Sequence, residues 1–165
     1  EIAEPRKRHL DLGEMERLAN ENGDGLADFS RLRWSDRHEV RQIKAATPDK
    51  VYRAEVSVQG KVNKERIDEV VESLNQARIT QQTPSRVAHR RANLARERTI
   101  RELVLESMEE DKLVLRLTTE SGTYVKEFVS GDEGRTVPSL AGLLGVPCQV
   151  IALDVIQIID NVNEG

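Results

Sequence analysis

Val51-Tyr52-Arg53-Ala54-Glu55-Val56-Ser57-Val58 is the stretch from which the fold of this chain can be derived. Apolar side chains occupy every second position from Tyr52 to Val58, and polar side chains stand between them. Successive side chains of a strand point to opposite faces, so this alternation indicates one buried face and one solvated face. The sequence therefore predicts a half-buried strand over residues 51–58.

The segments that follow this strand alternate between helical and extended patterns. Residues 64–76 place apolar side chains at helical spacing and predict an amphipathic helix. Residues 99–107 and 113–119 predict two antiparallel strands around a polar turn. Residues 122–129 are expected to start extended and then become helical.

Two more elements are expected toward the end of the chain and one near its beginning. Residues 139–144 predict a short helix that Gly145 ends. Residues 149–159 are apolar almost throughout and predict a last strand in the interior of the sheet. Residues 10–20 predict a helix with Asp11 as its N-cap.

The order of these elements predicts an α+β fold around a mostly antiparallel sheet flanked by helices. Residues 1–5 are interpreted as the tail of a strand that begins upstream, so we expect the sheet to be incomplete at its N-terminal side. We expect residues 1–165 to form one segment of one domain, with no separate second domain.

Composition narrows the class of protein. Aromatic residues make up only 3% of the 165 residues, so the core must be aliphatic. One cysteine, Cys148, forms no intrachain disulfide and indicates a reducing compartment. No signal peptide and no apolar run of membrane-spanning length are found, so we expect a cytoplasmic protein without a membrane partner.

Charge is strongly segregated although the net charge is only −4. Residues 78–101 hold seven arginines, no lysine and one acid, whereas residues 102–133 hold nine acids and three basic residues. A local basic stretch can bind phosphates even in an acidic protein, because salt screens the more distant charges and the charges near the phosphate determine the attraction. The alternative is a solvated charged face that the acidic neighbour balances.

Other chemistries find little support. His9, His38 and His89 lie far apart in the sequence, without metal-ligand spacing, so no metal site is predicted. Cys148 begins an apolar strand and is interpreted as a buried small hydrophobe rather than a nucleophile. No glycine pattern for nucleotide binding occurs, so no cofactor is expected.

Three stretches, in order, resemble the C-terminal part of the catalytic domain of the archaeal and eukaryotic tRNA pseudouridine synthases that act on T-loop positions 54 and 55. The third stretch is the most specific, because a Gly-Thr-Tyr-aliphatic-basic run typifies the wider pseudouridine synthase class. The stretches are Lys50-Val51-Tyr52-Arg53-Ala54, Thr83-Pro84-Ser85-Arg86-Val87-Ala88-His89-Arg90-Arg91, and Gly122-Thr123-Tyr124-Val125-Lys126-Glu127-Phe128-Val129-Ser130-Gly131-Asp132-Glu133-Gly134-Arg135-Thr136, with Pro138-Ser139-Leu140 and Leu143-Leu144-Gly145 after the last.

The resemblance implies catalytic roles for three residues. Tyr52 matches the tyrosine that packs on the target base and helps to remove its proton. Lys126 matches the basic residue that pairs with the catalytic aspartate, and Leu143 matches the aliphatic residue that closes the pocket beneath it. Without the resemblance, the three are interpreted as a strand aromatic, a surface lysine and a core leucine.

The resemblance also implies an RNA partner and no cofactor. The expected partner is the T-arm of tRNA, contacted by basic residues on the three stretches: Lys50, Arg86, His89, Arg90, Arg91 and Arg135. In this family the aspartate nucleophile lies upstream of the matched segment. We therefore expect the isolated segment to be inactive and to need the N-terminal part of the same enzyme as a partner.

Three functional hypotheses follow. The first is an isomerase that converts uridine to pseudouridine, with an aspartate supplied from outside this segment. The second is a module that binds structured RNA without chemistry. The third is a protein-interaction segment that uses the acidic residues 102–133.

Overall fold

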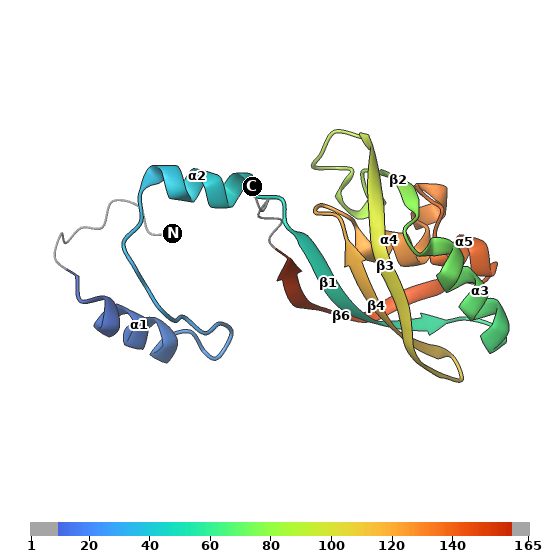
Figure 1. Cartoon of the computed structure of the whole chain (residues 1–165), viewed down its shortest axis with the longest axis horizontal. Coiled ribbons are helices and arrows are strands. Elements are labelled where there is room, and N and C mark those ends of the chain that lie inside the picture. The colour runs from blue at the N-terminus through green and yellow to red at the C-terminus, as the bar shows by residue number, and fades with distance from the viewer. Residues whose placement is uncertain (1–9, 160–165) are drawn as a thin grey trace. The chain divides into compact units, whose positions relative to one another are not determined.

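The computed structural model describes residues 10–159. Contacts divide them into two compact units, residues 10–46 and residues 47–159, and each unit is described by itself (Figure 1). The predicted strand tail at residues 1–5 and His9 lie outside the described residues. That the chain has no separate second domain stays a prediction.

The first unit consists of two helices, α1 (Leu12–Glu21) and α2 (Arg37–Ala45), and a connecting loop. The predicted cap of α1 is confirmed, because the Asp11 carboxylate accepts a hydrogen bond from the Glu14 N–H at 3.1 Å. Asp36 caps α2 in the same way. The sequence did not predict α2, because charged side chains surround its few apolar residues. No residue of either helix is buried within the described part of the chain.

The second unit is a six-stranded sheet with helices on it. The strands follow the order β5-β2-β3-β4-β1-β6, and every neighbouring pair is antiparallel. The predicted α+β fold with a mostly antiparallel sheet flanked by helices is confirmed. The strands are β1 (Asp49–Val58), β2 (Arg78–Gln82), β3 (Ala95–Glu109), β4 (Lys112–Thr119), β5 (Thr136–Val137) and β6 (Cys148–Ile159), and the helices are α3 (Lys64–Leu74), α4 (Val125–Ser130) and α5 (Leu140–Leu144), with the 3-10 turns η1 (Ser85–Val87) and η2 (Asp132–Gly134).

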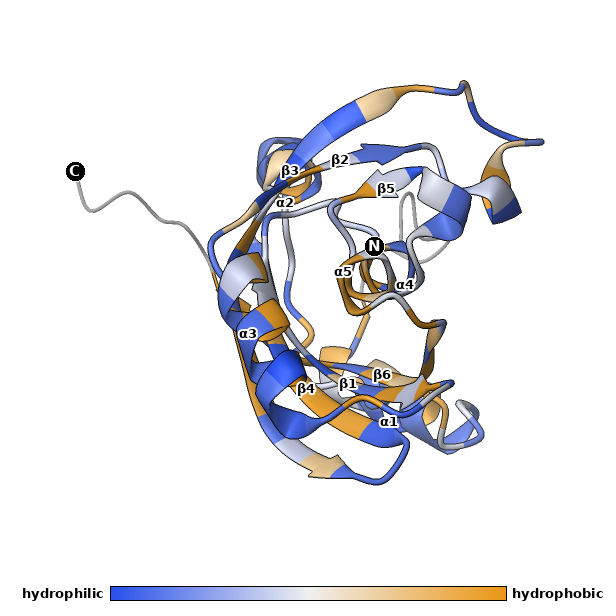
Figure 2. Cartoon of the chain, turned by 90° about the vertical axis from the view of Figure 1, so that its right-hand side faces the viewer, coloured by the Kyte–Doolittle hydropathy of each residue, from blue (hydrophilic) through white to orange (hydrophobic). Residues whose placement is uncertain are grey.

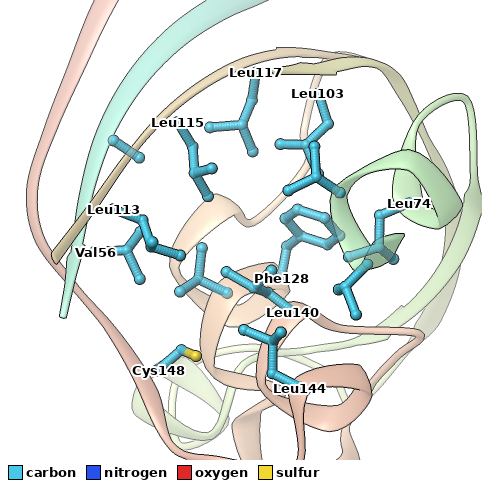
Figure 3. Close-up of a cluster of buried hydrophobic side chains, with 14 of the residues drawn as sticks. Val56, Leu74, Leu103, Leu113, Leu115, Leu117, Phe128, Leu140, Leu144 and Cys148 are labelled. Atoms are coloured by element: carbon cyan, nitrogen blue, oxygen red, sulfur yellow. The ribbon is translucent and has the colours of Figure 1, made fainter. Parts of the chain in front are cut away.

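The core lies between the sheet and the layer of α3, α4 and α5. Figure 3 shows Phe128 of α4 among leucines of β3 and β4 on one side and Leu140 and Leu144 of α5 on the other. Figure 2 shows that α5 is hydrophobic along most of its length. Because full burial of one leucine-sized side chain contributes about 1.5–3 kcal/mol, this aliphatic cluster is the main stabilising term of the unit.

The opposite face of the sheet is polar, as the alternation of residues 51–58 predicts. Arg53 of β1 forms ion pairs with Glu55 and Glu106, and Arg116 of β4 pairs with Glu102 and Glu106. These side chains are all partly exposed, so the network keeps this face solvated and adds little stability.

The position of the last strand corrects one prediction. Residues 149–159 are indeed extended, but β6 lies at an edge of the sheet formed by the described residues and pairs only with β1. An apolar run was interpreted as burial on both faces. Instead, four aliphatic side chains of β6 remain more than half exposed: Ile151, Val155, Ile156 and Ile158.

Cys148, at the start of β6, is buried in the core as predicted. Burial raises the pKa of its thiol to about 11. Because the thiolate is the nucleophilic form, Cys148 is a packing residue at neutral pH.

Leu115→Ala tests the core of the second unit. Leu115 is fully buried, so we expect its truncation to lower the free energy of unfolding by about 2–5 kcal/mol. Leu94→Ala is the matched control, since Leu94 is about half exposed and should change stability by less than about 0.5 kcal/mol. Urea unfolding followed by circular dichroism measures both, and equal effects would contradict the described core.

Candidate functional site

Tyr52 lies on the helix-covered face of the sheet. In β1 it stands opposite Leu117 of β4 and Val155 of β6, and its half-buried ring packs against the core. Burial raises the pKa of its hydroxyl, so the phenol is protonated at neutral pH. The side chain therefore offers a flat apolar surface with a hydrogen-bonding tip.

Lys50 precedes Tyr52 by two residues and thus has its side chain on the same face of β1. It is half-buried and stands opposite Thr119 of β4 and Ile158 of β6. The buried hydroxyl of Thr119 has no hydrogen-bond partner among residues 10–159. The side chains of Lys50 and Tyr52 therefore lie one after the other on the same face of β1.

Gln81 holds the start of α4. Its side chain is 1% exposed, its Oε1 accepts from the Tyr124 N–H at 2.9 Å, and its Nε2 donates to the Tyr124 carbonyl at 3.0 Å. The same Nε2 donates to Thr136 Oγ1 at 3.3 Å. A buried amide that satisfies both backbone groups of one residue fixes that residue, and with it the first turn of α4.

The end of α4 is equally defined. Gly131 has φ of +82°, and a Cβ there would stand 2.8 Å from Ser139 Oγ. Only glycine fits this left-handed position without displacing Ser139. The six-residue helix is therefore fixed at both ends.

Adjacent residues of α4 point in opposite directions. Lys126 is exposed and forms no ion pair within residues 10–159. Glu127 is 5% exposed, and its Oε2 has no hydrogen-bond partner in the described part of the chain. The helix therefore presents a cation outward and holds a carboxylate inward.

The basic loop between β2 and β3 is anchored to η2. The Ser85 N–H donates to Asp132 Oδ2 at 2.9 Å, and Arg135 Nη2 donates to the Thr83 carbonyl at 2.8 Å and to Asn93 Oδ1 at 2.7 Å. Arg135, predicted as an RNA ligand, thus closes the base of the loop while remaining partly exposed.

The same loop also contacts α4 directly. Arg86 Nε donates to Glu127 Oε1 at 2.7 Å, and Arg91 Nη1 donates to Tyr124 Oη at 3.3 Å. His89 and Arg90 are exposed, and Arg90 Nε donates to His89 Nε2 at 2.7 Å. The second and third of the three stretches are therefore one structural unit.

Other predicted contacts are less direct. Leu143 of α5 is half-buried against the same core as Tyr52, and its carbonyl accepts from Arg66 Nη2 at 2.7 Å. The helix that carries Lys126 packs on β6, the neighbour of β1. No hydrogen bond or ion pair within residues 10–159 joins Tyr52 to Lys126, so their shared pocket stays a prediction.

An open cavity of about 570 Å³ lies elsewhere. None of the predicted site residues lines it: Lys61, Val62, Asn63, Arg66, Leu144 and Val146 do. Because no residue of the matched stretches apart from Leu144 lines this cavity, it does not replace the predicted site.

Sequence reasoning missed Gln81 and Glu127. Gln81 lies in β2, whose single buried apolar residue, Ile79, gives too weak an alternation to indicate a strand. Glu127 was counted in the acidic segment, and its inward direction could have been inferred from its position three residues after Tyr124 on a predicted helix. Within the described ranges, no three His, Cys, Asp or Glu side chains are grouped to hold a metal ion.

The helices in the described part of the chain are also too short or too polar to cross a membrane. The described geometry therefore joins a cation-bearing helix to an arginine-rich loop, and it places the half-buried Tyr52 on the helix-covered face of the sheet.

The fold is similar to that of a solved structure. A chain in the crystal structure of a Cbf5-Nop10-Gar1 complex superposes with a TM-score of 0.58 at 24% identity, over 73% of this chain and 34% of that one. At this level of identity the likeness concerns the fold.

The family is given by sequence. A family model described as Pus10, C-terminal, matches residues 1–159, and the chain belongs to this family. The resemblance to tRNA pseudouridine synthases is thereby confirmed.

Curated relatives named tRNA pseudouridine synthase Pus10 agree with this assignment. The protein of Halorubrum lacusprofundi is 40% identical over 96% of this chain and 37% of its own length. That of Pyrococcus furiosus is 38% identical over 99% and 42%, and that of Archaeoglobus fulgidus is 42% identical over 96% and 43%. The chain thus spans about two-fifths of the length of these relatives.

Gln81→Leu tests the fixation of α4. The variant leaves the N–H of Tyr124 without a partner, whereas the carbonyl of Tyr124 keeps the hydrogen bond from the Phe128 N–H at 2.9 Å, so we expect a loss of about 1–3 kcal/mol in the free energy of unfolding. Gln82→Leu is the matched control, because Gln82 is the exposed next residue of β2 and its replacement should be nearly neutral. Urea denaturation compares them, and similar stabilities would show that the amide does not hold the helix.

Proposed function

We propose that this chain is the segment of a tRNA pseudouridine synthase that grips the RNA and holds the target uracil. The observation that carries the proposal is the unit formed by the basic loop and α4. Gln81 fixes this helix, Lys126 projects from it, and the loop arginines stand against it. Membership of the Pus10 C-terminal family supports the same activity.

The proposed chemistry begins with extrusion of a uridine from the RNA stack. Extrusion costs a few kcal/mol, which contacts between the base and apolar or aromatic surfaces offset. Tyr52 supplies the flat surface, and Leu143 supplies the aliphatic wall. Because burial keeps the Tyr52 hydroxyl protonated, stacking and hydrogen-bond donation are its main contributions before any proton is removed from the base.

The covalent steps need a carboxylate nucleophile. In the proposal an aspartate from another part of the full-length enzyme attacks the ribose or the base, the bond between N1 and C1′ breaks, and the freed uracil rotates. C5 then bonds to C1′ as the aspartate is released, C5 loses its proton, and N1 gains one. Lys126 would stand beside this carboxylate, since a cation within about 4–6 Å favours the ionised form and fixes its direction. Lys126 is exposed and has no ion pair within residues 10–159, which leaves its ammonium free to pair with such a carboxylate.

The proposed RNA contacts come from the loop and from Lys50. His89, Arg90 and Arg91 are exposed at the loop tip, where the imidazole and the two guanidiniums can approach the phosphates of a T-arm. Lys50 continues the line of Tyr52 along β1. Arg86 and Arg135 are ion-paired to protein carboxylates but remain partly exposed.

The activity can be tested directly in a full-length enzyme that contains this segment. The protein is incubated with T-arm RNA, and pseudouridine is detected by carbodiimide adducts and reverse-transcription stops. We expect a stop at a T-loop uridine. The absence of a stop, while an established synthase produces one, would refute the proposed isomerase.

A second candidate function is RNA binding without chemistry. Its supporting observation is the arginine-rich segment 78–101, in which Arg90 and Arg91 are exposed and form no ion pair within residues 10–159. This candidate requires the full-length protein to bind T-arm RNA, with an affinity that falls steeply as salt rises, and to leave all uridines unmodified.

Lys126→Ala should remove turnover more than binding. Loss of one preorganised charge at a reacting centre lowers kcat by about 10²–10³-fold. A cation that does not contact a phosphate contributes little to the affinity for RNA. Single-turnover pseudouridine formation and filter binding measure the two effects in the full-length enzyme. Lys112→Ala, which removes an exposed lysine at the far end of β4, is the control. Equal losses of turnover and binding would instead indicate a folding role.

Tyr52→Phe and Tyr52→Ala separate the ring from its hydroxyl. Stacking of a base on an aromatic side chain contributes about 1–3 kcal/mol, so we expect the alanine variant to lose about 5- to 150-fold in kcat/KM. The phenylalanine variant keeps the ring and should lose much less. If both variants lose the same amount, the hydroxyl rather than the ring surface carries the role.

A further inference from the structure

The guanidinium of Arg86 is held from one side only. Its Nε donates to Glu127 Oε1 at 2.7 Å, and its Nη1 and Nη2 have no hydrogen-bond partner within residues 10–159. The Arg86 side chain is 56% exposed, whereas the Glu127 side chain is only 7% exposed. A buried carboxylate therefore orients a mostly exposed arginine whose two terminal nitrogens have no partner within residues 10–159.

Arg91 is held in a related way by Tyr124, the N-cap residue of α4. Its Nη1 donates to the hydroxyl of Tyr124, the residue that Gln81 fixes. Tyr124 and Glu127 are three residues apart, a spacing that puts them on the same side of a helical turn. Arg86 is consequently anchored on α4, and Arg91 is anchored on the residue that caps this helix.

The Arg86–Glu127 pair is poorly explained as a stabilising ion pair. Arg86 is mostly exposed, and exposed pairs contribute little to stability. Meanwhile, Glu127 Oε2 is buried without a partner in the described part of the chain, which is unfavourable for the folded state. The arrangement uses a buried charge to fix the direction of a surface guanidinium.

We propose that Glu127 and Tyr124 are positioning residues that hold Arg86 and Arg91 as two preorganised forks for neighbouring phosphates of the bound RNA. A guanidinium fork matches two phosphate oxygens, and fixing it before binding reduces the conformational entropy lost on association. This inference rests on the proposed function, because it names how the RNA backbone is held there. Since Lys126 precedes Glu127 directly, the same contact also sets the position of Lys126 relative to the RNA.

The sign of one charge change distinguishes this proposal from general electrostatics. Glu127→Gln removes a negative charge from the protein, so attraction by net charge alone would strengthen RNA binding. Loss of the aimed Arg86 fork would weaken it. We expect Kd for a T-arm hairpin to rise about tenfold, the scale of one charge-assisted contact.

The experiment measures Kd of the whole chain for that hairpin at several salt concentrations. The variants are Glu127→Gln, Arg86→Ala and their double variant, and Tyr124→Phe is compared with Arg91→Ala. If Glu127 acts through Arg86, the double variant binds no more weakly than Arg86→Ala alone. Glu102→Gln is the matched control, since Glu102 pairs with Arg116 at 2.9 Å on the outer face of the sheet, and its Kd should stay unchanged or fall slightly.

Arg86→Lys provides a test that does not alter the buried carboxylate. It keeps the charge but loses the fork, so we expect about the same weakening as in Arg86→Ala. Tight binding by Glu127→Gln, additive losses in the double variant, or wild-type affinity in Arg86→Lys would each overturn the positioning role. If the unaltered chain itself fails to bind the hairpin, the proposed RNA contact fails first, and this inference falls with it.

Discussion

The bidentate contact between the Gln81 amide and the backbone of Tyr124 is the constraint on which the proposed site depends. It joins residues 43 positions apart and connects β2, the strand beside the edge strand β5, with the first turn of α4. Everything that the helix presents, Lys126 outward and Glu127 inward, takes its direction from this start. The aliphatic core beneath Phe128 then fixes the rest of the helix against the sheet.

The charge of the arginine-rich segment 78–101 allows two interpretations, a phosphate-binding surface and a charged face balanced by acidic neighbours. Different arginines of the segment fit each of them. Arg86 and Arg101 pair with the carboxylates of Glu127 and Asp49, and so they belong to a balanced surface. Arg90 and Arg91 form no ion pair within the described residues and extend from a loop that is anchored at both ends. A net balance over a segment therefore says less about phosphate binding than the partner of each side chain does.

The sequence predicted the elements whose burial is periodic. The alternation of β1 and the helical spacing of α3 are strong because each element buries one face only. The prediction that β6 lies in the interior of the sheet was wrong. The apolar character of a strand does not determine how many strands pair with it. The partners of Gln81 and Glu127 could not be predicted, because they are distant in sequence and only the folded chain brings these polar side chains together.

For the site residues taken from the family resemblance, the sequence predicted the residue types and their positions in the chain. It did not predict how their side chains are arranged in space. A tyrosine on a strand and a lysine after Gly-Thr-Tyr can be found in the printed sequence. Their surroundings depend on the pairing of β1 with β4 and β6 and on the packing of α4 on β6. These are long-range contacts, which no single segment encodes.

The single thiol of the chain has a practical consequence. Cys148 stands opposite Val58 where β1 and β6 begin their pairing, and its sulfur is enclosed by the core. A thiol reagent can reach it only when this end of the sheet separates or the whole unit unfolds. The rate at which the reagent labels Cys148 therefore measures how often that edge opens, and no probe has to be introduced.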